Sequence, residues 1–234
     1  MQPIFLKNLG KKSFKETWEL QEKLFNQIIE IKNNNRKNNQ KTPTPSYLLV
    51  VEHPHVYTLG KSGDLSNLLI NQQQLNQHNI DFYKINRGGD ITYHGPGQLV
   101  VYPILDLENF FTDIHKYLRL LEEVVIKTLA EYGLKGERSE GETGVWIDKH
   151  TLSARKICAL GVRLSRWVTM HGFALNVHTD LNYFQKIVPC GIQGKSVTSI
   201  QSELKKEISL EEVLPKILNH FTELFQVQFQ NIDL

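Results

Sequence analysis

The stretch RGGDITYHGPGQLVVYPILDL, residues 87–107, decides the fold. Its second half, from Gln98 to Leu107, is almost entirely apolar, and such a run is typical of a strand that is buried on both faces of a sheet. Pro103 lacks the amide hydrogen that a sheet ladder uses, so we expect a bulge or the end of the strand there. The core sheet of the protein therefore passes through residues 98–107.

The sequence on either side of this strand alternates between strand and helix patterns. Further strands are predicted at 47–51, 80–85, 144–147, 156–162 and 171–177. Helices are predicted at 14–32, where Ser13 and Glu16 form a capping box, at 113–132, before Gly133, and from Ser209, with Glu212 as its capping partner. The polar stretch 33–46, which contains two prolines, is predicted to be a solvated loop. Together these patterns predict one domain, residues 1–234, of the α/β (α+β) class around one sheet.

The composition is that of a soluble globular protein. The chain has 234 residues, 40% hydrophobic and 22% charged, which is long enough for one core and a pocket. Its formal net charge of +2 is too small to predict a nucleic acid partner. No apolar stretch has the length that spans a bilayer and no leader pattern is present, so we expect a cytoplasmic protein with no membrane partner.

Cys158 and Cys190 are too few for a disulfide framework, which favours a reducing compartment. Cys190 lies between Pro189 and Gly191, a turn context in which a thiol can reach a cleft. Cys158 lies in the apolar run KICALGV, where a free cysteine is usually a small core residue. A structural role remains the alternative for Cys190 as well, since most single cysteines are not catalytic.

Lys156 opens the apolar strand at 156–162, where a lysine is rarely buried without a partner or a function. A partly desolvated amine has a lowered pKa and exchanges protons near neutral pH. The alternative is a lysine at the exposed start of the strand. Period-two alternation places Lys156 and Cys158 on the same face, about 7 Å apart along the strand, so Cys158 stays a rival nucleophile.

Residues 87–98 place four glycines and a proline around Thr92, Tyr93 and His94. Glycine lets the backbone approach a ligand closely, and such a turn presents several N–H donors, which suits an oxygen-rich or carbonyl ligand. A tight structural turn is the alternative. The segment is not the phosphate-binding loop of nucleotide hydrolases, because no GKS or GKT closes it.

The histidines offer competing chemistry. His53 and His55 flank a proline, but two histidines alone make a poor metal site, so we expect no metal. His94 is a candidate general base for a cysteine, which would make the protein a Cys-His hydrolase or amide-forming enzyme instead of a Cys-Lys transferase. Spacing along the sequence does not separate these options.

The glycine-rich segment, followed by KICALGVRL, HGFALNV and PCGI with VTSI, resembles the lipoyl(octanoyl) transferase family in order and spacing between Tyr47 and Ile200. The resemblance implies a catalytic domain like that of biotin and lipoate protein ligases, with a central mixed β-sheet flanked by helices. It also implies an acyltransferase that moves an octanoyl group in protein lipoylation, in lipoate biosynthesis, with no cofactor.

The resemblance also implies roles for individual residues. Cys190 would take the octanoyl group as a thioester, and Lys156 would lower the pKa of that cysteine. Three segments would form the acyl pocket, namely Arg87, Gly88, Gly89, Asp90, Ile91, Thr92, Tyr93 and His94, then Ala159, Leu160 and Gly161, and finally Gly172, Phe173 and Ala174.

The partners that the resemblance implies are octanoyl-acyl carrier protein as donor, and the lipoyl domains of 2-oxoacid dehydrogenases and the glycine cleavage H protein as acceptors. Because acyl carrier proteins are acidic, we expect basic side chains to surround the pocket mouth and steer docking. The candidates are Lys61, Lys84, Arg87, Arg155 and Arg163.

Two other functions remain open. An ATP-dependent lipoate or biotin ligase would share the fold, but the GRGRxGR segment of biotin ligases is absent and Cys190 would have no role in a ligase. A non-catalytic module that docks lipoyl domains or acyl carrier protein would not need both Cys190 and Lys156. Cys158 stands where we expect a small apolar residue, so oxidation or competing acylation is conceivable there.

Overall fold

The computed structural model describes residues 1–188 and 196–232, and a mixed sheet of nine strands is their largest element. The strand order is β12-β1-β2-β6-β10-β9-β8-β7, with β11 paired to β9. Its strands are β1 (Gln2–Lys11), β2 (Tyr47–Glu52), β6 (Gln98–Ile104), β7 (Glu137–Ser139), β8 (Glu142–Ile147), β9 (Arg155–Ser165), β10 (Val168–Asn176), β11 (Ser196–Val197) and β12 (Val227–Asn231). β1 runs parallel to β12 and β2, β11 runs parallel to β9, and the remaining pairs are antiparallel.

β6 lies in the middle of this sheet, as its apolar sequence predicts. It pairs with β2 on one side and β10 on the other, and every one of its residues is buried. Its ladder with β10 ends at Val101, and the strand itself ends at Ile104, directly after Pro103. Beyond that point, side-chain hydrogen bonds of Thr169 take the place of the backbone ladder. Its hydroxyl donates to the Pro103 carbonyl (2.9 Å) and accepts from the Leu105 amide (3.0 Å). The strand end expected near Pro103 is confirmed.

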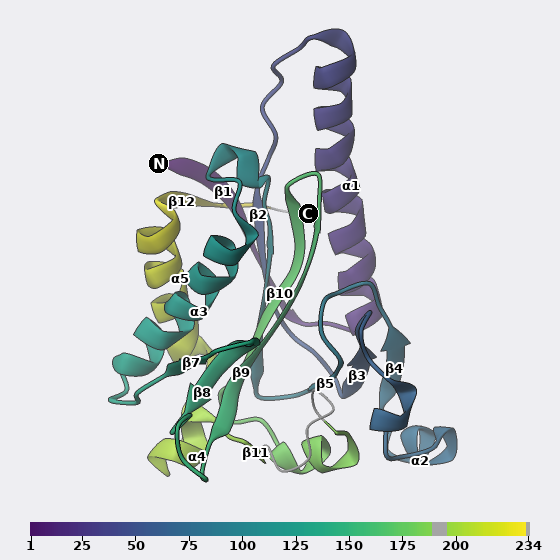
Figure 1. The fold of residues 1–234 in the computed structure, drawn as a ribbon, viewed down its shortest axis with the longest axis vertical. Coiled ribbons are helices and arrows are strands. Elements are labelled where there is room, and N and C mark those ends of the chain that lie inside the picture. The colour runs from purple at the N-terminus through teal and green to yellow at the C-terminus, as the bar shows by residue number, and fades with distance from the viewer. Residues whose placement is uncertain (189–195, 233–234) are drawn as a thin grey trace.

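Helices cover both faces of the large sheet (Figure 1). α3 (Ile114–Ala130) and α5 (Leu210–Phe225) pack together on one face, over the larger apolar core. α1 (Phe14–Asn38) covers the other face with Leu24, Phe25 and Ile28. The predicted α/β domain with a central mixed sheet flanked by helices is therefore confirmed. None of the described helices combines the length and the apolar character needed to cross a membrane.

A second, three-stranded sheet lies beside the large one, in the order β4 (Asp81–Lys84), β3 (Val56–Leu59), β5 (Ile91–His94). β4 confirms the strand predicted at 80–85, but β5 lies inside the segment predicted to be a loop. The turn conformation is confined to its flanks, where Gly89 (φ 87°) and Gly97 (φ 79°) take left-handed values that favour glycine. Between them, the β-branched and aromatic residues of ITYH favour a strand.

The other described elements are short. They are the helices α2 (Gln72–Gln77) and α4 (Ile200–Leu204), and the 3₁₀ turns η1 (Leu65–Asn67), η2 (Leu107–Asn109) and η3 (Leu181–Lys186).

The solvated loop predicted at 33–46 is wrong in its first half. α1 continues to Asn38, where Arg36 and Lys37 in the last turn suit the negative end of the helix dipole, and Asn39 (φ 51°) caps it in a left-handed conformation. The side chain of Asn35 then fastens the following chain by donating to the Thr42 carbonyl (2.7 Å) and accepting from the Thr42 amide (3.0 Å). Residues 40–46 have neither helix nor strand.

Candidate active site

A cavity of about 480 Å³ is lined by residues of both sheets and by the start of α1. Its volume lies within the range of small-molecule sites in proteins. The lining residues are Phe14, Ser62, Ile85, Arg87, Gly89, Asp90, Ile91, Thr92, His94, Val100, Tyr102, Gly141, Glu142, Thr143, Lys156, Ala159, Leu160, Gly161, His171, Gly172, Phe173, Ala174, Phe184 and Val197. The structure thus brings together residues from many parts of the sequence, between Phe14 and Val197.

Most of the residues expected to form an acyl pocket line this one cavity. They are Arg87, Gly89, Asp90, Ile91, Thr92 and His94 from β5 and the turn before it, Ala159, Leu160 and Gly161 from β9, and Gly172, Phe173 and Ala174 from β10. Lys156, at the start of β9, lines the same cavity.

Gly88 and Tyr93 do not line the cavity. Successive side chains of a strand point to opposite faces, and Tyr93 packs with Tyr57 on the face opposite to Thr92 and His94. Ile91, at the end of β5, belongs to the same cluster as Tyr93 but still reaches the cavity. The Tyr93 hydroxyl lies 2.7 Å from His55 Nδ1. Gly88 instead joins the turn to β9, through its amide, which donates to the Val162 carbonyl (2.9 Å).

Two glycines let the walls of the cavity approach closely. Gly161 and Gly172 are paired across β9 and β10. A Cβ atom on Gly172 would lie 2.1 Å from the Val101 carbonyl oxygen, and one on Gly161 would lie 2.9 Å from the Gly88 carbonyl oxygen. Both contacts are with backbone, which cannot move aside as a side chain can. These positions therefore require glycine for packing.

Lys156 is held where β9, β8 and β11 meet. Its amine lies 4.7 Å from the centroid of the Trp146 ring, and its stem passes Gly144, where a Cβ atom would lie 3.3 Å from Lys156 Cε. On the other side its backbone pairs with Val197 of β11. The side chain therefore has an aromatic wall beside it and the cavity in front of it.

The prediction that Lys156 and Cys158 share one face of the strand is wrong. The register between β8 and β9 shifts, because Trp146 pairs with Lys156 while its neighbour Val145 pairs with Cys158. Ile157 is the extra residue, as in a β-bulge, so the alternation breaks between the two positions. Cys158 is fully buried in the main core, and burial raises the pKa of its thiol. Cys158 is therefore not a rival nucleophile.

Three buried histidines are neutral near pH 7, and two of them, His94 and His171, line the cavity. Burial lowers the pKa of His94 to about 3, of His171 to about 3 and of His53 to about 4. His94 Nδ1 lies 2.7 Å from Gln98 Oε1, so Nδ1–H is the donor and the Nε2 lone pair stays available. An imidazole with so low a pKa is a weak base near neutral pH, which disfavours His94 as the general base for a cysteine.

The basic residues expected around the pocket mouth differ in their availability. Lys61 and Lys84 are exposed and adjoin the lining residues Ser62 and Ile85. Arg87 is buried and donates to the Thr58 carbonyl (2.8 Å), so it is a wall residue rather than a steering charge.

Arg155 and Arg163 are already engaged with side chains of this chain. Arg155 forms ion pairs with Glu203 and Asp148, while Arg163 lies over the Phe25 ring and 3.8 Å from Glu22. Of these five expected residues, Lys61 and Lys84 are therefore the two whose side chains are exposed.

Several lining residues were not predicted from the sequence. Phe14 follows the capping serine of α1, Val100 and Tyr102 alternate along β6, and His171 directly precedes Gly172. Residues two apart in the strand predicted at 98–107 share one face, which was a usable signal that Val100 and Tyr102 point the same way. For His171 the signal was its position directly before Gly172, which was expected to line the pocket. Phe14 had no such signal, because its contact depends on where α1 crosses the sheet.

Cys190 lies outside the described residues. The lining residues Phe184 and Val197 stand on either side of the segment that contains it. Within residues 1–188 and 196–232, no group of three or more His, Cys, Asp or Glu side chains is arranged to hold a metal ion.

Comparison with known proteins places the chain in a family. Residues 13–222 match the model of the lipoyl protein ligase A/B catalytic domain. The chain is 66% identical over 228 residues to the octanoyltransferase of Christiangramia forsetii, covering 97% of each protein. It is 66% identical over 223 residues to that of Flavobacterium psychrophilum, covering 95% of this chain and 96% of that protein.

A solved structure shows the same fold at low identity. It is the bipartite lipoate protein ligase of Thermoplasma acidophilum, with a TM-score of 0.74 at 16% identity, over 100% of this chain and 88% of that one. This likeness confirms the expected lipoate-ligase-like architecture.

Proposed function

Because the chain belongs to the lipoyl protein ligase A/B catalytic domain family and is an octanoyltransferase of protein lipoylation, we propose that it carries the octanoyl group as a thioester on Cys190. Lys156 moves the protons of both half-reactions. The proposed donor is octanoyl-acyl carrier protein, and the proposed acceptors are the lipoyl domains of 2-oxoacid dehydrogenases and the glycine cleavage H protein.

The observation that carries this proposal is the placement of Lys156 on the wall of a cavity with a largely apolar lining. Phe14, Leu160 and Phe173 are among the side chains that an alkyl chain would contact there. Burial of each methylene group contributes about 0.8 kcal/mol. Cys190 belongs to the segment that joins two further lining residues, Phe184 and Val197, which supports a thiol acting at this cavity.

In the first half-reaction the Cys190 sulfur attacks the carbonyl carbon of the donor thioester. Lys156 accepts the thiol proton and gives it to the departing pantetheine sulfur, so a new thioester forms as the old one breaks. The exchange of one thioester for another is nearly isoenergetic, which explains why the step needs no ATP. The apolar walls exclude water that would otherwise hydrolyse the intermediate.

In the second half-reaction the ε-amine of the acceptor lysine attacks the same carbonyl carbon. A free lysine has a pKa near 10.4 and is mostly protonated at neutral pH, so a base must remove its proton. Lys156 accepts that proton and releases it to solvent. It then takes the second proton, which the nitrogen loses as the amide forms, and gives it to the departing Cys190 sulfur. The product amide is more stable than the thioester, and the transfer runs downhill.

Intact-mass spectrometry of the protein after incubation with octanoyl-acyl carrier protein tests the proposal. Without ATP we expect one added octanoyl group that hydroxylamine removes, present in Cys158→Ser and absent in Cys190→Ser. An adduct that persists in Cys190→Ser, or one that forms only with ATP and free octanoate, would contradict the thioester on Cys190.

A further inference from the structure

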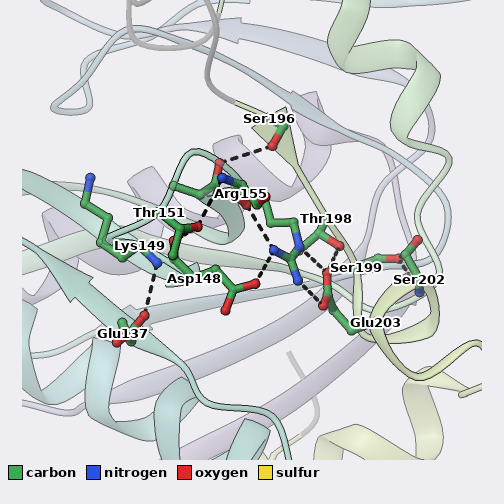
Figure 2. A network of polar contacts seen from close by, with 12 residues as sticks. Glu137, Asp148, Lys149, Thr151, Arg155, Ser196, Thr198, Ser199, Ser202 and Glu203 are labelled. Carbon is green, nitrogen blue, oxygen red and sulfur yellow. Dashed lines mark hydrogen bonds and ion pairs between the residues drawn. The ribbon is translucent and has the colours of Figure 1, made fainter.

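Figure 2 shows a network of polar side chains around Arg155, which directly precedes Lys156 in the sequence. Arg155, the residue before it, donates from Nε and Nη2 to the two carboxylate oxygens of Glu203, at 2.6 Å and 2.5 Å. Both side chains are largely buried, and two parallel bonds of this kind fix the orientation of the guanidinium as well as its position. Asp148 accepts a third bond from Arg155 Nη1 at 2.6 Å.

Thr198 connects the same carboxylate to Lys156 itself. Its hydroxyl donates to Glu203 Oε1 at 2.5 Å, and its amide donates to the Lys156 carbonyl at 2.9 Å. Thr198 follows β11, whose Val197 pairs with Lys156. The Glu203 carboxylate therefore restrains β9 immediately before Lys156 and also the chain that pairs with Lys156.

The network continues to a second lining residue of the cavity, His94. Asn176 Nδ2 donates to the Thr198 carbonyl (3.0 Å), and Gln98 Nε2 donates to Asn176 Oδ1 (2.9 Å). Gln98 Oε1 in turn accepts from His94, a lining residue. Gln98, Asn176 and Thr198 are all buried, and a buried polar chain is stable only when its members are satisfied.

We infer that Glu203 is a positioning residue for Lys156. The inference rests on the proposed role of Lys156 in proton transfer. Among the described residues, Glu203 is not part of the cavity lining and its carboxylate bonds Arg155 and Thr198, so it would act on the reaction through these two residues. With the backbone held on both sides, only the side-chain torsions of Lys156 decide where its amine lies. An amine displaced by about 1 Å transfers protons much more slowly.

A double-mutant cycle between Glu203→Gln and Lys156→Ala tests this inference. The readout is the single-turnover rate of octanoyl transfer from octanoyl-acyl carrier protein to a lipoyl domain, followed by mass spectrometry. We expect Glu203→Gln to slow the reaction about tenfold, with the KM for the donor within about twofold of wild type. In the Lys156→Ala background the same change should have almost no effect, because the group that Glu203 positions is gone.

Equal slowing by Glu203→Gln in both backgrounds, or a wild-type rate in Glu203→Gln, would overturn the positioning role. A wild-type rate in Lys156→Ala alone would instead overturn the proposed function, so the two failures are distinguishable. Glu131→Gln is the matched control, because that carboxylate accepts from Lys216 (2.6 Å) and His220 (2.7 Å) away from the cavity. Its rate should stay at the wild-type value.

Thr198 provides a second test that does not alter the ion pair with Arg155. Thr198→Ser keeps the hydroxyl that donates to Glu203 and should retain the wild-type rate. Thr198→Val keeps the shape but loses the donor, and should slow the reaction as Glu203→Gln does. If Glu203→Gln does not fold, the cycle is run with Thr198→Val and Lys156→Ala, and equal rates for the serine and valine variants contradict the inference.

Discussion

The neighbouring groups confine the side chain of Lys156. The Trp146 ring lies beside the amine, and the absence of a Cβ atom on Gly144 leaves room for the lysine stem. A lysine in this setting can serve as acid and base in turn, as the two half-reactions require. The proposed proton transfer therefore depends on where the Lys156 amine is held as well as on the presence of a lysine at this position.

Replacing Lys156 tests that dependence. We expect Lys156→Ala to lower the rate of octanoyl transfer roughly 100- to 10,000-fold, the contribution of a positioned acid–base group. Lys156→Arg should not restore the rate, because a guanidinium does not release its proton near neutral pH. Single-turnover kinetics measures both rates, and circular dichroism checks that each variant is folded. A rate for Lys156→Ala within threefold of wild type would contradict the role.

Sequence reasoning identified Lys156 but not its surroundings. The local pattern alone was enough to single out a lysine at the start of an apolar strand, and the structure places that lysine in the cavity wall. The bulge at Ile157 reversed the predicted relation to Cys158, because a register shift depends on the partner strand and leaves no local signal. Phe14 also lacked a local signal, because it reaches the cavity only where α1 crosses the sheet.

At the scale of elements, the start of α1 links local sequence to the cavity wall. The capping box at Ser13 and Glu16 was predictable from residue type and spacing, and Ser13 Oγ accepts from the Glu16 amide at 3.3 Å. The residue after this cap is Phe14, which lines the cavity. The end of the helix was not predictable, because the asparagine-rich stretch continues the helix to Asn38.

Removal of the Ser13 cap of α1 should therefore lower the free energy of unfolding. Ser13→Ala leaves the amides of the first turn without their side-chain acceptor, which costs about 1 kcal/mol of unfolding free energy. Urea unfolding followed by circular dichroism measures the loss. Ser209→Ala, which removes the equivalent cap of α5 (Ser209 Oγ to the Glu212 amide, 3.2 Å), is the matched control for a helix that supplies no lining residue.

Only Ser13→Ala should also weaken binding of the octanoyl donor, because only α1 carries a lining residue next to its cap. A KM for the donor that changes equally in both variants would contradict the link between the α1 cap and the cavity.

For the whole molecule, the buried histidines predict how stability depends on pH. His53, His94 and His171 have folded-state pKa values of about 3 to 4, below the unfolded value near 6.5. The unfolded state thus binds more protons between pH 6.5 and about 4, so the stabilising contribution is complete above pH 6.5 and falls as the pH drops. Acidic pH should therefore destabilise the folded protein, because unfolding lets these buried histidines take up protons.

We expect the unfolding free energy to fall between pH 7 and pH 5 by about 2 kcal/mol for each of these histidines, from the linkage relation. Urea unfolding at the two pH values measures the change. His171→Asn should reduce the pH dependence, while substitution of the exposed His115 by Asn should not. A free energy that is equal at pH 7 and pH 5 would show that the histidines do not stay neutral in the folded state.

Charge at the pocket mouth is a second property of the whole molecule. Lys61→Glu combined with Lys84→Glu should raise the KM for the acidic donor about tenfold at low ionic strength, and the difference should vanish near 1 M salt, where charges are screened. Lys37→Glu, in the last turn of α1, should leave the KM unchanged. An equal KM for the double variant and wild type at low salt would exclude steering by these two lysines.

More of the fold than of the site could be predicted from the sequence. The buried strand at 98–107, the helix at 113–132 and the flanking strands follow from local periodicity, and they led to the correct architecture. β1 was not predicted, because its half-exposed sequence has no clear alternation and its position depends on pairing with β2 and with the distant β12. The catalytic role of Cys190 stays a prediction from its sequence motif, since this residue lies outside the described residues.

The central claim is that the Cys190 thioester is a true intermediate, and a chase of the isolated acyl-enzyme tests it most directly. Protein acylated by octanoyl-acyl carrier protein is freed of donor and mixed with an unmodified lipoyl domain in the absence of ATP. We predict that the octanoyl group moves to the domain lysine at least as fast as steady-state turnover. An adduct that stays on the protein, or moves more slowly than turnover, would contradict the account.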